Sequence, residues 1–391
     1  MERRTILKGI GATAAVGMMP SIARAQGEPI KIGLVLPLTG PFTSTGKQIA
    51  AAANLYMAQK GASVAGRKVE LIIKDDTGVP DVGRRLSQEL IVNDKVTAIG
   101  GFGLTPIALA TAPVATQGKT PMVVMAAATS IITERSPFIV RTSQVVPQIS
   151  GPFGTWIAQQ GIKRIVTMVS DFAPGHDVEA SFTATFKEAG GQTEAMRIPL
   201  QNPDFSPFLQ RAADARPEAI LIFVPSGQGS TFMKQFAERG LDKSGIRLIG
   251  TGDVTDDDIL PAMGDAALGV TTAHHYSAAH PSATNKAYVE AFQRANPGMR
   301  PNFMSVGGYD GMHALYEGLK KTNGQGGEAL VEAMKGLSWE SPRGPMSIDP
   351  ETRDIIQNVY IRKVERVNGE LHNVEFHTIP NVKDPAKAAK K

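Results

Sequence analysis

Hydrophobic residues recur along the chain as short continuous runs that alternate with longer amphipathic stretches. Runs such as Lys31–Leu36, Val69–Lys74 and Ala219–Val224 are largely apolar or β-branched, and they predict strands buried on both faces of a parallel sheet. Between the runs lie stretches such as Lys47–Lys60 and Pro80–Val92, whose apolar residues have helical spacing. This alternation predicts an α/β protein.

The alternation occurs twice, which predicts two doubly wound parallel-sheet lobes, one before and one after about residue 146. The first series has strands at 31–36, 69–74, 98–100, 122–125 and 138–141, with helices at 47–60, 80–92 and 105–116. The second series has strands at 164–169, 194–198, 219–224 and 247–249, with helices at 155–160, 178–189, 205–215 and 229–239.

A third stretch does not repeat this pattern. It predicts a strand at 270–275, helices at 285–296, 306–321 and 328–337, and an antiparallel strand pair at 355–366 and 371–378. Asn368-Gly369 is a strong hairpin turn between the last two strands. We expect the late helices to return to the first lobe and the last strands to the second, which gives several crossings, a hinge and a cleft.

These crossings predict the domain boundaries. The first lobe would comprise 28–146 plus 274–354, and the second lobe 147–273 plus 355–380. Residues 381–391 contain four lysines and are predicted to form a flexible basic tail.

The N-terminus has the pattern of an export signal. Arg3 and Arg4 precede a Gly/Ala-rich apolar run, and Ala23–Ala25 is a cleavage site of the A-x-A type. Paired arginines favour the twin-arginine variant over an ordinary Sec signal. We therefore expect residues 1–25 to be a signal peptide; the rest of the chain has no apolar run of about 18 residues and predicts no stable membrane insertion.

Composition narrows the possible functions. The chain has no cysteine, which excludes disulfides, Fe–S clusters and cysteine nucleophiles. Most of its net charge of +4 belongs to residues 1–25, so the pattern predicts no nucleic-acid-binding face. We expect no metal or other cofactor. Catalysis has no support either, because Pro225-Ser226-Gly227 lacks the leading glycine of a hydrolase elbow.

Two small-residue loops follow neighbouring strands of the predicted first sheet. Gly100–Gly103 leads into Thr105-Pro106 at a helix start, and Ala126–Ser130 follows the next strand. Such loops can be simple turns and caps. They can also bind a carboxylate, because helix N-termini offer free N–H groups at the ligand-binding edge of a parallel sheet. Asp253 lies at the end of a second-lobe strand, which is also a cleft position.

Several segments, in this order and spacing, resemble one known family. They are Ile32–Pro41 (IGLVLPLTGP), Leu71–Asp76 (LIIKDD), Gly100-Gly101 followed by Ala126–Ser130, Ser170–Gly175 (SDFAPG) and Gly308–Asp310 (GYD). Together they resemble the leucine/isoleucine/valine-binding family of periplasmic solute-binding proteins, which serve ABC importers. The resemblance covers nearly all of the chain after the signal.

The resemblance implies a type I periplasmic binding fold with a three-crossing hinge. It implies a periplasmic, non-enzymatic monomer that closes on a small carboxylate and delivers it to an ABC permease and, indirectly, to its ATPase. Matching the family's loops implies that Thr105, Ala127 and Thr129 hold the carboxylate. It also implies that Asp253 meets an ammonium group and that Phe172 replaces an aromatic residue of the second lobe.

The ligand class stays open between branched-chain or aromatic amino acids and amine-free aromatic or hydrophobic acids. Phe42, Phe102, Phe172 and Tyr276 could form a ring-stacking pocket, and we expect Phe172 and Tyr276 above all to face the ligand. Besides a transport receptor, the sequence allows two alternative functions: an exported ligand sensor on the same scaffold and an exported hydrolase.

Overall fold

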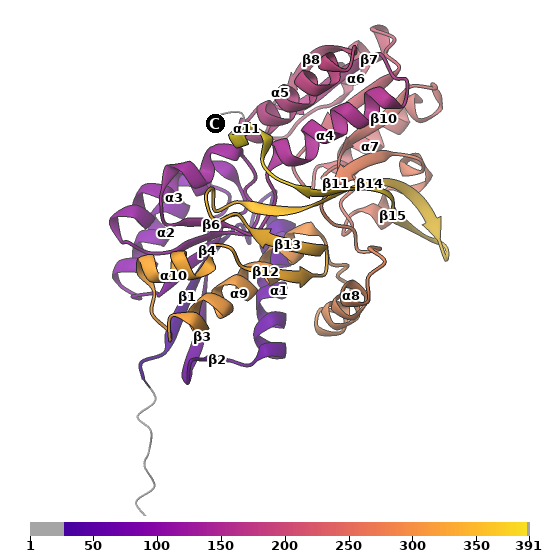
Figure 1. Cartoon of the computed structure of the whole chain (residues 1–391). Coiled ribbons are helices and arrows are strands. Elements are labelled where there is room, and N and C mark those ends of the chain that lie inside the picture. The colour runs from indigo at the N-terminus through magenta and orange to yellow at the C-terminus, as the bar shows by residue number, and fades with distance from the viewer. Residues whose placement is uncertain (1–26, 389–391) are drawn as a thin grey trace, which may run out of the picture.

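A computed structural model describes residues 27–388. The predicted signal at 1–25 lies outside the described residues. The chain forms two α/β lobes, each built on its own sheet, and Figure 1 shows them side by side. Within the described range no helix is both long and apolar enough to cross a membrane.

The first lobe is built on a six-stranded sheet with the order β2-β3-β1-β4-β5-β6. Its strands are β1 (Ile30–Leu36), β2 (Ser63–Val64), β3 (Arg67–Asp75), β4 (Ala98–Gly101), β5 (Met122–Val124) and β6 (Ile139–Arg141). All neighbours are parallel except β2, which is antiparallel to β3. The parallel part matches the continuous apolar runs of the sequence.

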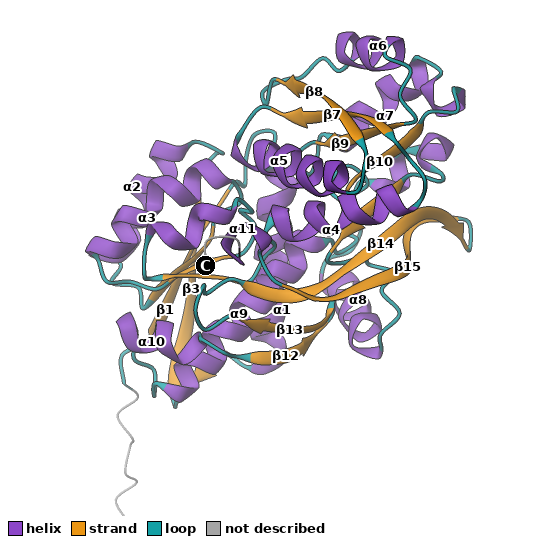
Figure 2. Ribbon diagram, turned by 45° about the horizontal axis from the view of Figure 1, so that its top comes forward, coloured by secondary structure: helices purple, strands orange, loops and turns teal. Residues whose placement is uncertain are grey.

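Helices cover both faces of this sheet (Figure 2). One apolar core joins it to α1 (Thr43–Lys60), α8 (Ala283–Ala295), α9 (Phe303–Lys321) and α10 (Gly327–Met334). A second core joins the other face to α2 (Pro80–Val92) and α3 (Thr105–Gln117). Pro80 and Pro106 occupy first-turn positions of α2 and α3, where a missing N–H costs nothing.

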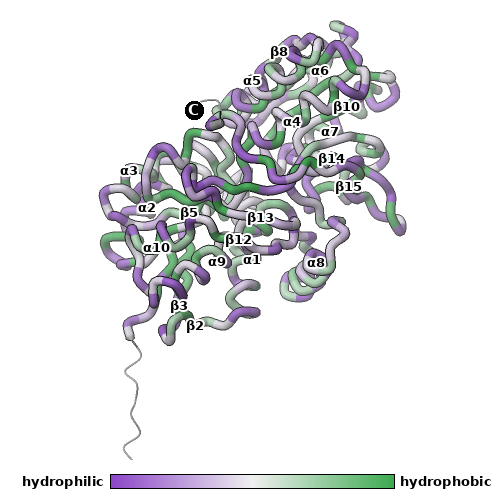
Figure 3. The backbone as a smooth tube through the Cα atoms, in the orientation of Figure 1, coloured by the Kyte–Doolittle hydropathy of each residue, from purple (hydrophilic) through white to green (hydrophobic). Residues whose placement is uncertain are grey.

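The second lobe is built on a nine-stranded sheet with the order β12-β13-β14-β11-β10-β9-β7-β8, and β15 pairs with β14. Its parallel part is β7 (Arg164–Ser170), β8 (Gln192–Ile198), β9 (Ala219–Phe223), β10 (Arg247–Thr251) and β11 (Thr271–His274). Helices α4 (Val146–Gln159) and α5 (Ala173–Glu188) lie against one core, and α6 (Ser206–Asp214) and α7 (Gly229–Glu238) against the other. Figure 3 shows hydrophobic segments along the strands of both lobes.

The remaining strands of this sheet are antiparallel. They are β12 (Ser338–Ser341), β13 (Gly344–Ile348), β14 (Ile355–Val367) and β15 (Glu370–Val382). The predicted hairpin joins β14 to β15 through Asn368 and Gly369, whose φ values are 51° and 88°. Positive φ at both positions is the reason for the Asn-Gly sequence.

Strands β12 and β13, which the pattern did not predict, link the two lobes. They are hydrogen-bonded into the second sheet, yet Met346 and Ile348 pack in the core of the first lobe. Gly344 and Pro345 interrupt the apolar alternation here, which hides the strand signal.

The C-terminal segment differs from the expected flexible tail. Strand β15 continues to Val382, and α11 (Pro385–Ala388) follows it. The ammonium group of Lys387 contacts Asp354 and Thr133 and is buried there. A lysine at this depth needs a carboxylate partner, and that partner fixes residues 381–388 against the first lobe. Residues 389–391 are outside the described range.

The chain passes between the lobes from β6 to α4, from β11 to α8 and from β13 to β14. Two ion pairs with almost fully buried side chains lie at these passages. The first joins the β6–α4 passage to the β13–β14 passage, and the arginine of the second also donates to the carbonyl oxygens of Thr142 and Ser143 in the β6–α4 passage. Arg141 Nε lies 3.0 Å from Asp354 Oδ1, and Arg343 Nη2 lies 2.8 Å from Asp310 Oδ2. Removing one partner of such a pair leaves a buried charge without compensation, so these pairs fix the geometry of the crossings.

Candidate functional site

A small cavity of about 40 Å³ lies between the lobes. Its first-lobe wall consists of Phe42, Thr45, Gly103, Leu104, Thr105, Ala126, Ala127, Ala128 and Met304, with Gln144 from the β6–α4 crossing. Its second-lobe wall consists of Phe172, Pro174, Phe223, Pro225, Ser226 and Asp253.

Small residues bring the first-lobe loops close to the cavity. A Cβ on Gly101 would lie 2.6 Å from the carbonyl oxygen of Val35, and one on Gly103 would lie 2.7 Å from a ring carbon of Pro37. The loop can therefore turn tightly between β4 and α3. Thr105 is the first residue of α3. Pro106 has no N–H and the N–H of Ile107 donates to the carbonyl of Leu104, which leaves the backbone N–H of Thr105 at the positive end of the helix dipole.

The second-lobe wall presents aromatic faces. The rings of Phe172 and Phe223 are stacked, with centroids 6.0 Å apart and an interplanar angle of 16°. Phe172 lies directly before α5, and Phe223 is the last residue of β9. Both rings therefore lie at the carboxyl end of the sheet, where ligands bind in such folds.

Asp253 is the charged residue of the cavity lining. Its Oδ2 accepts a 2.8 Å hydrogen bond from Thr251 and lies 3.7 Å from His274 Nε2, and its side chain is only 7% exposed. Burial lowers the pKa of His274, so this ring is neutral at neutral pH. A Cβ on Gly252 would collide with both His274 and Arg362, which explains the glycine beside Asp253.

Polar contacts hold the lobes together beside the cavity. Asn302, the N-cap of α9, donates a 2.8 Å hydrogen bond to Asp256 of the second lobe, and Ser44 of α1 donates to Asp258. Burial and the nearby charge of Asp258 raise the pKa of Asp256 well above its usual range. Burial therefore favours the protonated form of Asp256, whereas the hydrogen bond that Ser226 donates favours the ionised form.

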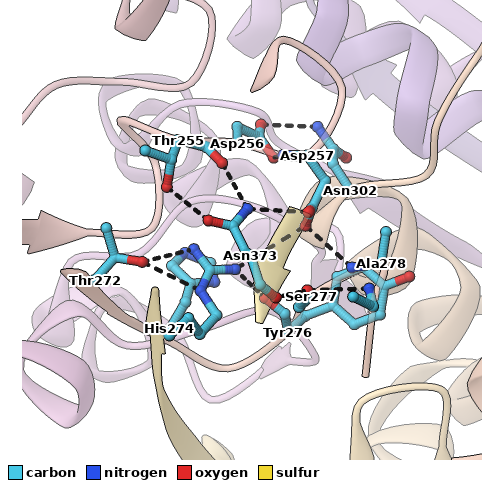
Figure 4. A network of polar contacts seen from close by, with 12 residues as sticks. Thr255, Asp256, Asp257, Thr272, His274, Tyr276, Ser277, Ala278, Asn302 and Asn373 are labelled. Carbon is cyan, nitrogen blue, oxygen red and sulfur yellow. Dashed lines mark hydrogen bonds and ion pairs between the residues drawn. The ribbon is translucent and has the colours of Figure 1, made fainter. Parts of the chain in front are cut away.

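Figure 4 shows how the β11–α8 crossing is anchored next to these contacts. Asp257 accepts hydrogen bonds from Asn373 Nδ2 at 3.0 Å and from the backbone N–H of Ala278 at 3.1 Å. The guanidinium of Arg362 donates to Thr272 and to the carbonyl of Tyr276. These bonds tie the crossing to strands β14 and β15.

The structure brings together five of the eight sequence-predicted site residues. Phe42, Thr105, Ala127, Phe172 and Asp253 line the cavity.

The other three are placed differently. Thr129 lies behind Thr105, with their hydroxyl oxygens 3.4 Å apart. Phe102 is fully buried in the core between the first sheet and α2 and α3. Tyr276 is fully buried in the other first-lobe core, and its hydroxyl has no partner among the described residues. Neither aromatic ring lines the cavity.

Sequence reasoning missed Gln144, Leu104, Phe223 and Ser226. Phe223 lies one residue before the end of the strand predicted at 219–224, so the rule about strand ends could have found it. Gln144 lies two residues before α4, and Pro147, Gly151 and Pro152 interrupt the helical pattern at the start of that helix. Nothing in the local sequence pattern therefore marked Gln144 as a site residue.

The arrangement of side chains around the cavity suits the binding of a ligand rather than the making or breaking of covalent bonds. Ser226, the serine of the cavity lining, donates to Asp256 instead of to a histidine, so it lacks the base that a serine nucleophile needs. Two α/β lobes with a partly aromatic cavity between them are typical of a small-molecule-binding protein.

The chain belongs to the periplasmic binding protein family, whose model matches residues 29–370. Members of this family and its structural neighbours are non-enzymatic substrate-binding proteins of ABC transporters. The fold is the type I fold of this family.

Relatives and solved structures cover almost the whole chain. "Leu/Ile/Val-binding protein homolog 6" of Brucella melitensis is 42% identical over 98% of this chain and 100% of that protein. A solute-binding protein of an ABC transporter from Rhodopseudomonas palustris BisB5, solved with 3,4-dihydroxybenzoic acid, is 61% identical. Its TM-score is 0.90, and the match covers 92% of this chain and 99% of that one. A counterpart from R. palustris HaA2, solved with p-hydroxybenzoic acid, is 39% identical over 92% of this chain and 100% of its own, with a TM-score of 0.89.

Proposed function

We propose that this protein is the periplasmic receptor of an ABC importer for an amine-free aromatic carboxylic acid. The observation that carries the proposal is the 61% identity, over almost the whole described chain, to a receptor solved with 3,4-dihydroxybenzoic acid. The cavity agrees with it, because Phe42, Phe172 and Phe223 offer flat apolar faces to a ring.

The first-lobe wall suits the carboxylate of such a ligand. It contains no acidic side chain and includes the first turn of α3 and the loop Ala126–Ala128. Free N–H groups at a helix N-terminus stabilise an anion. The ring then lies between the aromatic residues, and its far end faces the second-lobe wall.

Transport follows from closure of the lobes. Ligand binding would favour the state in which Asn302 and Ser44 reach the second lobe, and a permease would recognise that state. Helices flanking the cleft mouth on both lobes would form the docking surface. In this proposal the receptor works as a monomer, is exported by the signal at 1–25, and passes its ligand to the permease, which the ATPase drives.

A branched-chain or aromatic amino acid is the second candidate. Asp253, a buried carboxylate at the cavity, could pair with an α-ammonium group, and the name of the Brucella relative points to such ligands.

A thermal-shift screen of the chain from Gln26 onward tests the proposal. One set contains benzoate, hydroxybenzoates and phenylpropanoids, and the other contains aliphatic and aromatic amino acids. A ligand at about 100 times its Kd stabilises the protein by roughly 2.7 kcal/mol, which raises Tm by several degrees. We expect the amine-free acids alone to raise Tm. A rise with amino acids only would reject the proposal in favour of the second candidate.

A further inference from the structure

A second pocket, of about 310 Å³, lies between α1, α8, α9 and β12. Its volume reaches the range of small-molecule sites, and it shares no lining residue with the cavity between the lobes. Along α1, Tyr56 in this pocket lies about 16 Å from Thr45 in the cavity. The pocket is therefore a separate candidate site. Five aromatic rings line it, and they belong to Tyr56, Tyr288, Tyr309, His313 and Trp339.

The polar groups of these rings are bonded to the protein. The indole N–H of Trp339 donates to Asp310 at 2.9 Å, and the hydroxyl of Tyr309 donates to Gln59 at 2.6 Å. The ring of His313 lies against that of Trp339, with centroids 4.8 Å apart. Trp339 and Tyr309 are only half-buried. Because their polar groups are occupied, the surface that these two rings offer to a ligand is aromatic carbon.

The charges around the rings favour a cation. Burial lowers the pKa of His313, so this ring is neutral at neutral pH. Of the two carboxylates in the lining, Asp310 is already paired with Arg343, whereas Glu340 is exposed and has no ion-pair partner among residues 27–388. The basic residue of the lining, Lys60, is exposed at the C-terminus of α1, where the negative end of the helix dipole also lies.

We propose that this pocket binds a small organic cation, with an alkylated ammonium group over the rings of Trp339 and Tyr309 and its charge facing Glu340. The faces of aromatic rings attract cations through their quadrupole, and tryptophan does so most strongly. A carboxylate would instead meet ring faces and a carboxylate of its own sign. This site therefore binds a different class of ligand from the cavity between the lobes and does not depend on the proposed function.

Intrinsic fluorescence tests the proposal, because the chain has two tryptophans. Trp156 belongs to α4 of the second lobe and does not line this pocket, so Trp156→Phe leaves Trp339 as the reporter. We expect choline to change the emission of this variant in a saturable way. The neutral analogue 3,3-dimethyl-1-butanol should bind at least about 10-fold more weakly. Equal binding of the two probes, or no response to choline, would overturn the proposal.

Calorimetric titration of single variants with choline tests the named residues. Trp339→Leu should raise the Kd of choline by at least about 10-fold. Glu340→Gln should raise it by about 3-fold, and Lys60→Gln should lower it by about 2-fold because an opposing charge is lost. Trp339→Leu also removes a hydrogen bond to the buried Asp310, so the two exposed variants carry the test if that variant does not fold. Unchanged Kd values in both, or shifts in the same direction, would overturn the assignment.

Glu332→Gln is the matched control for Glu340→Gln. Glu332 is exposed on α10, pairs with Lys335 and does not line the pocket, so we expect an unchanged Kd for choline. Saturating 4-hydroxybenzoate should also leave this Kd unchanged, and competition would place choline between the lobes and overturn the proposal. If the chain does not bind 4-hydroxybenzoate at all, the proposed function is wrong, and the choline titrations still decide on this pocket.

Discussion

The two walls of the cavity differ in chemistry although both lie at the carboxyl ends of parallel strands. The first-lobe wall contains small residues and a helix N-terminus and carries no charged side chain. The second-lobe wall carries Asp253 and two stacked aromatic rings. Under the proposed function, the start of α3 would accommodate an anionic group on one side, and the carboxylate of Asp253 would accept from a donor group on the other. The difference shows how one cleft can orient an asymmetric ligand.

The largest expected effect on ligand affinity comes from adding a negative charge to the uncharged first-lobe wall. Ala127→Asp would place a carboxylate beside the ligand carboxylate. Two like charges about 4 Å apart near a protein surface repel by roughly 4 kcal/mol, so we expect titration calorimetry to show a loss of affinity of at least about 100-fold. Ala127→Ser is the control and should bind nearly normally. Retained affinity in a folded Ala127→Asp variant would show that the carboxylate lies elsewhere.

Removing an aromatic ring from the second-lobe wall should have the next largest effect. Phe172→Ala deletes the ring that stacks on Phe223, and the lost ring contacts should raise Kd by about 10-fold. Phe172→Tyr keeps the ring and should stay within about 3-fold of the native value. Phe376→Ala removes a ring that is 51% exposed on β15, and it should leave Kd unchanged. An equal rise in Kd with Phe376→Ala would mean that the loss of affinity does not come from the missing ring in the cavity.

Contact between the walls should depend on pH through Asp256. Burial raises the pKa of this group where it meets Asn302, so closure is favoured below the ordinary Asp pKa of 3.8 and becomes less favourable as pH rises through the raised value. A ligand carboxyl with a pKa of about 4 is already ionised above about pH 5. We therefore expect Kd to increase as pH rises from about pH 5.

Asp256→Asn should flatten this profile, because the amide does not ionise. Asp265→Asn, at an exposed carboxylate that pairs with Arg366, is the matched control and should keep the native profile. A profile that is flat in the native chain would contradict proton-linked closure.

The smallest expected effect concerns a single hydroxyl of the first-lobe wall. Thr105 is buried at the first turn of α3 and lines the cavity. Thr105→Val removes one neutral hydrogen-bonding group and should raise Kd about 3-fold. Thr105→Ser should restore the native value. If Thr105→Val lost as much affinity as Ala127→Asp, the side chain of Thr105, rather than the backbone, would hold the anion.

Much of the fold follows from periodicity alone. The helix predicted at Pro80–Val92 is observed with those bounds, and the apolar runs at 164–169 and 219–224 became strands β7 and β9. These segments combine a clear period with strong end signals. Where glycine and proline interrupt the pattern, as in β13 and in the first half of α4, prediction from the sequence was incomplete.

The candidate site was harder to predict for a physical reason. The strand-end rule identifies which loops face the cleft and found Asp253, and the family resemblance then selected Thr105 and Ala127 within the first-lobe loops. It does not say which way a side chain points: at Phe102, a φ of 63° accompanies a ring buried in the core, and Gly103 lines the cavity instead. The side-chain oxygen of Gln144 has no partner among the described residues, and no local pattern in the sequence encodes this.

The most direct test of the central claim is a calorimetric titration of the chain from Gln26 onward with 4-hydroxybenzoate and, separately, with L-leucine. The account predicts saturable one-to-one binding of 4-hydroxybenzoate and no measurable heat with L-leucine. Saturable binding of L-leucine together with no response to 4-hydroxybenzoate would contradict it.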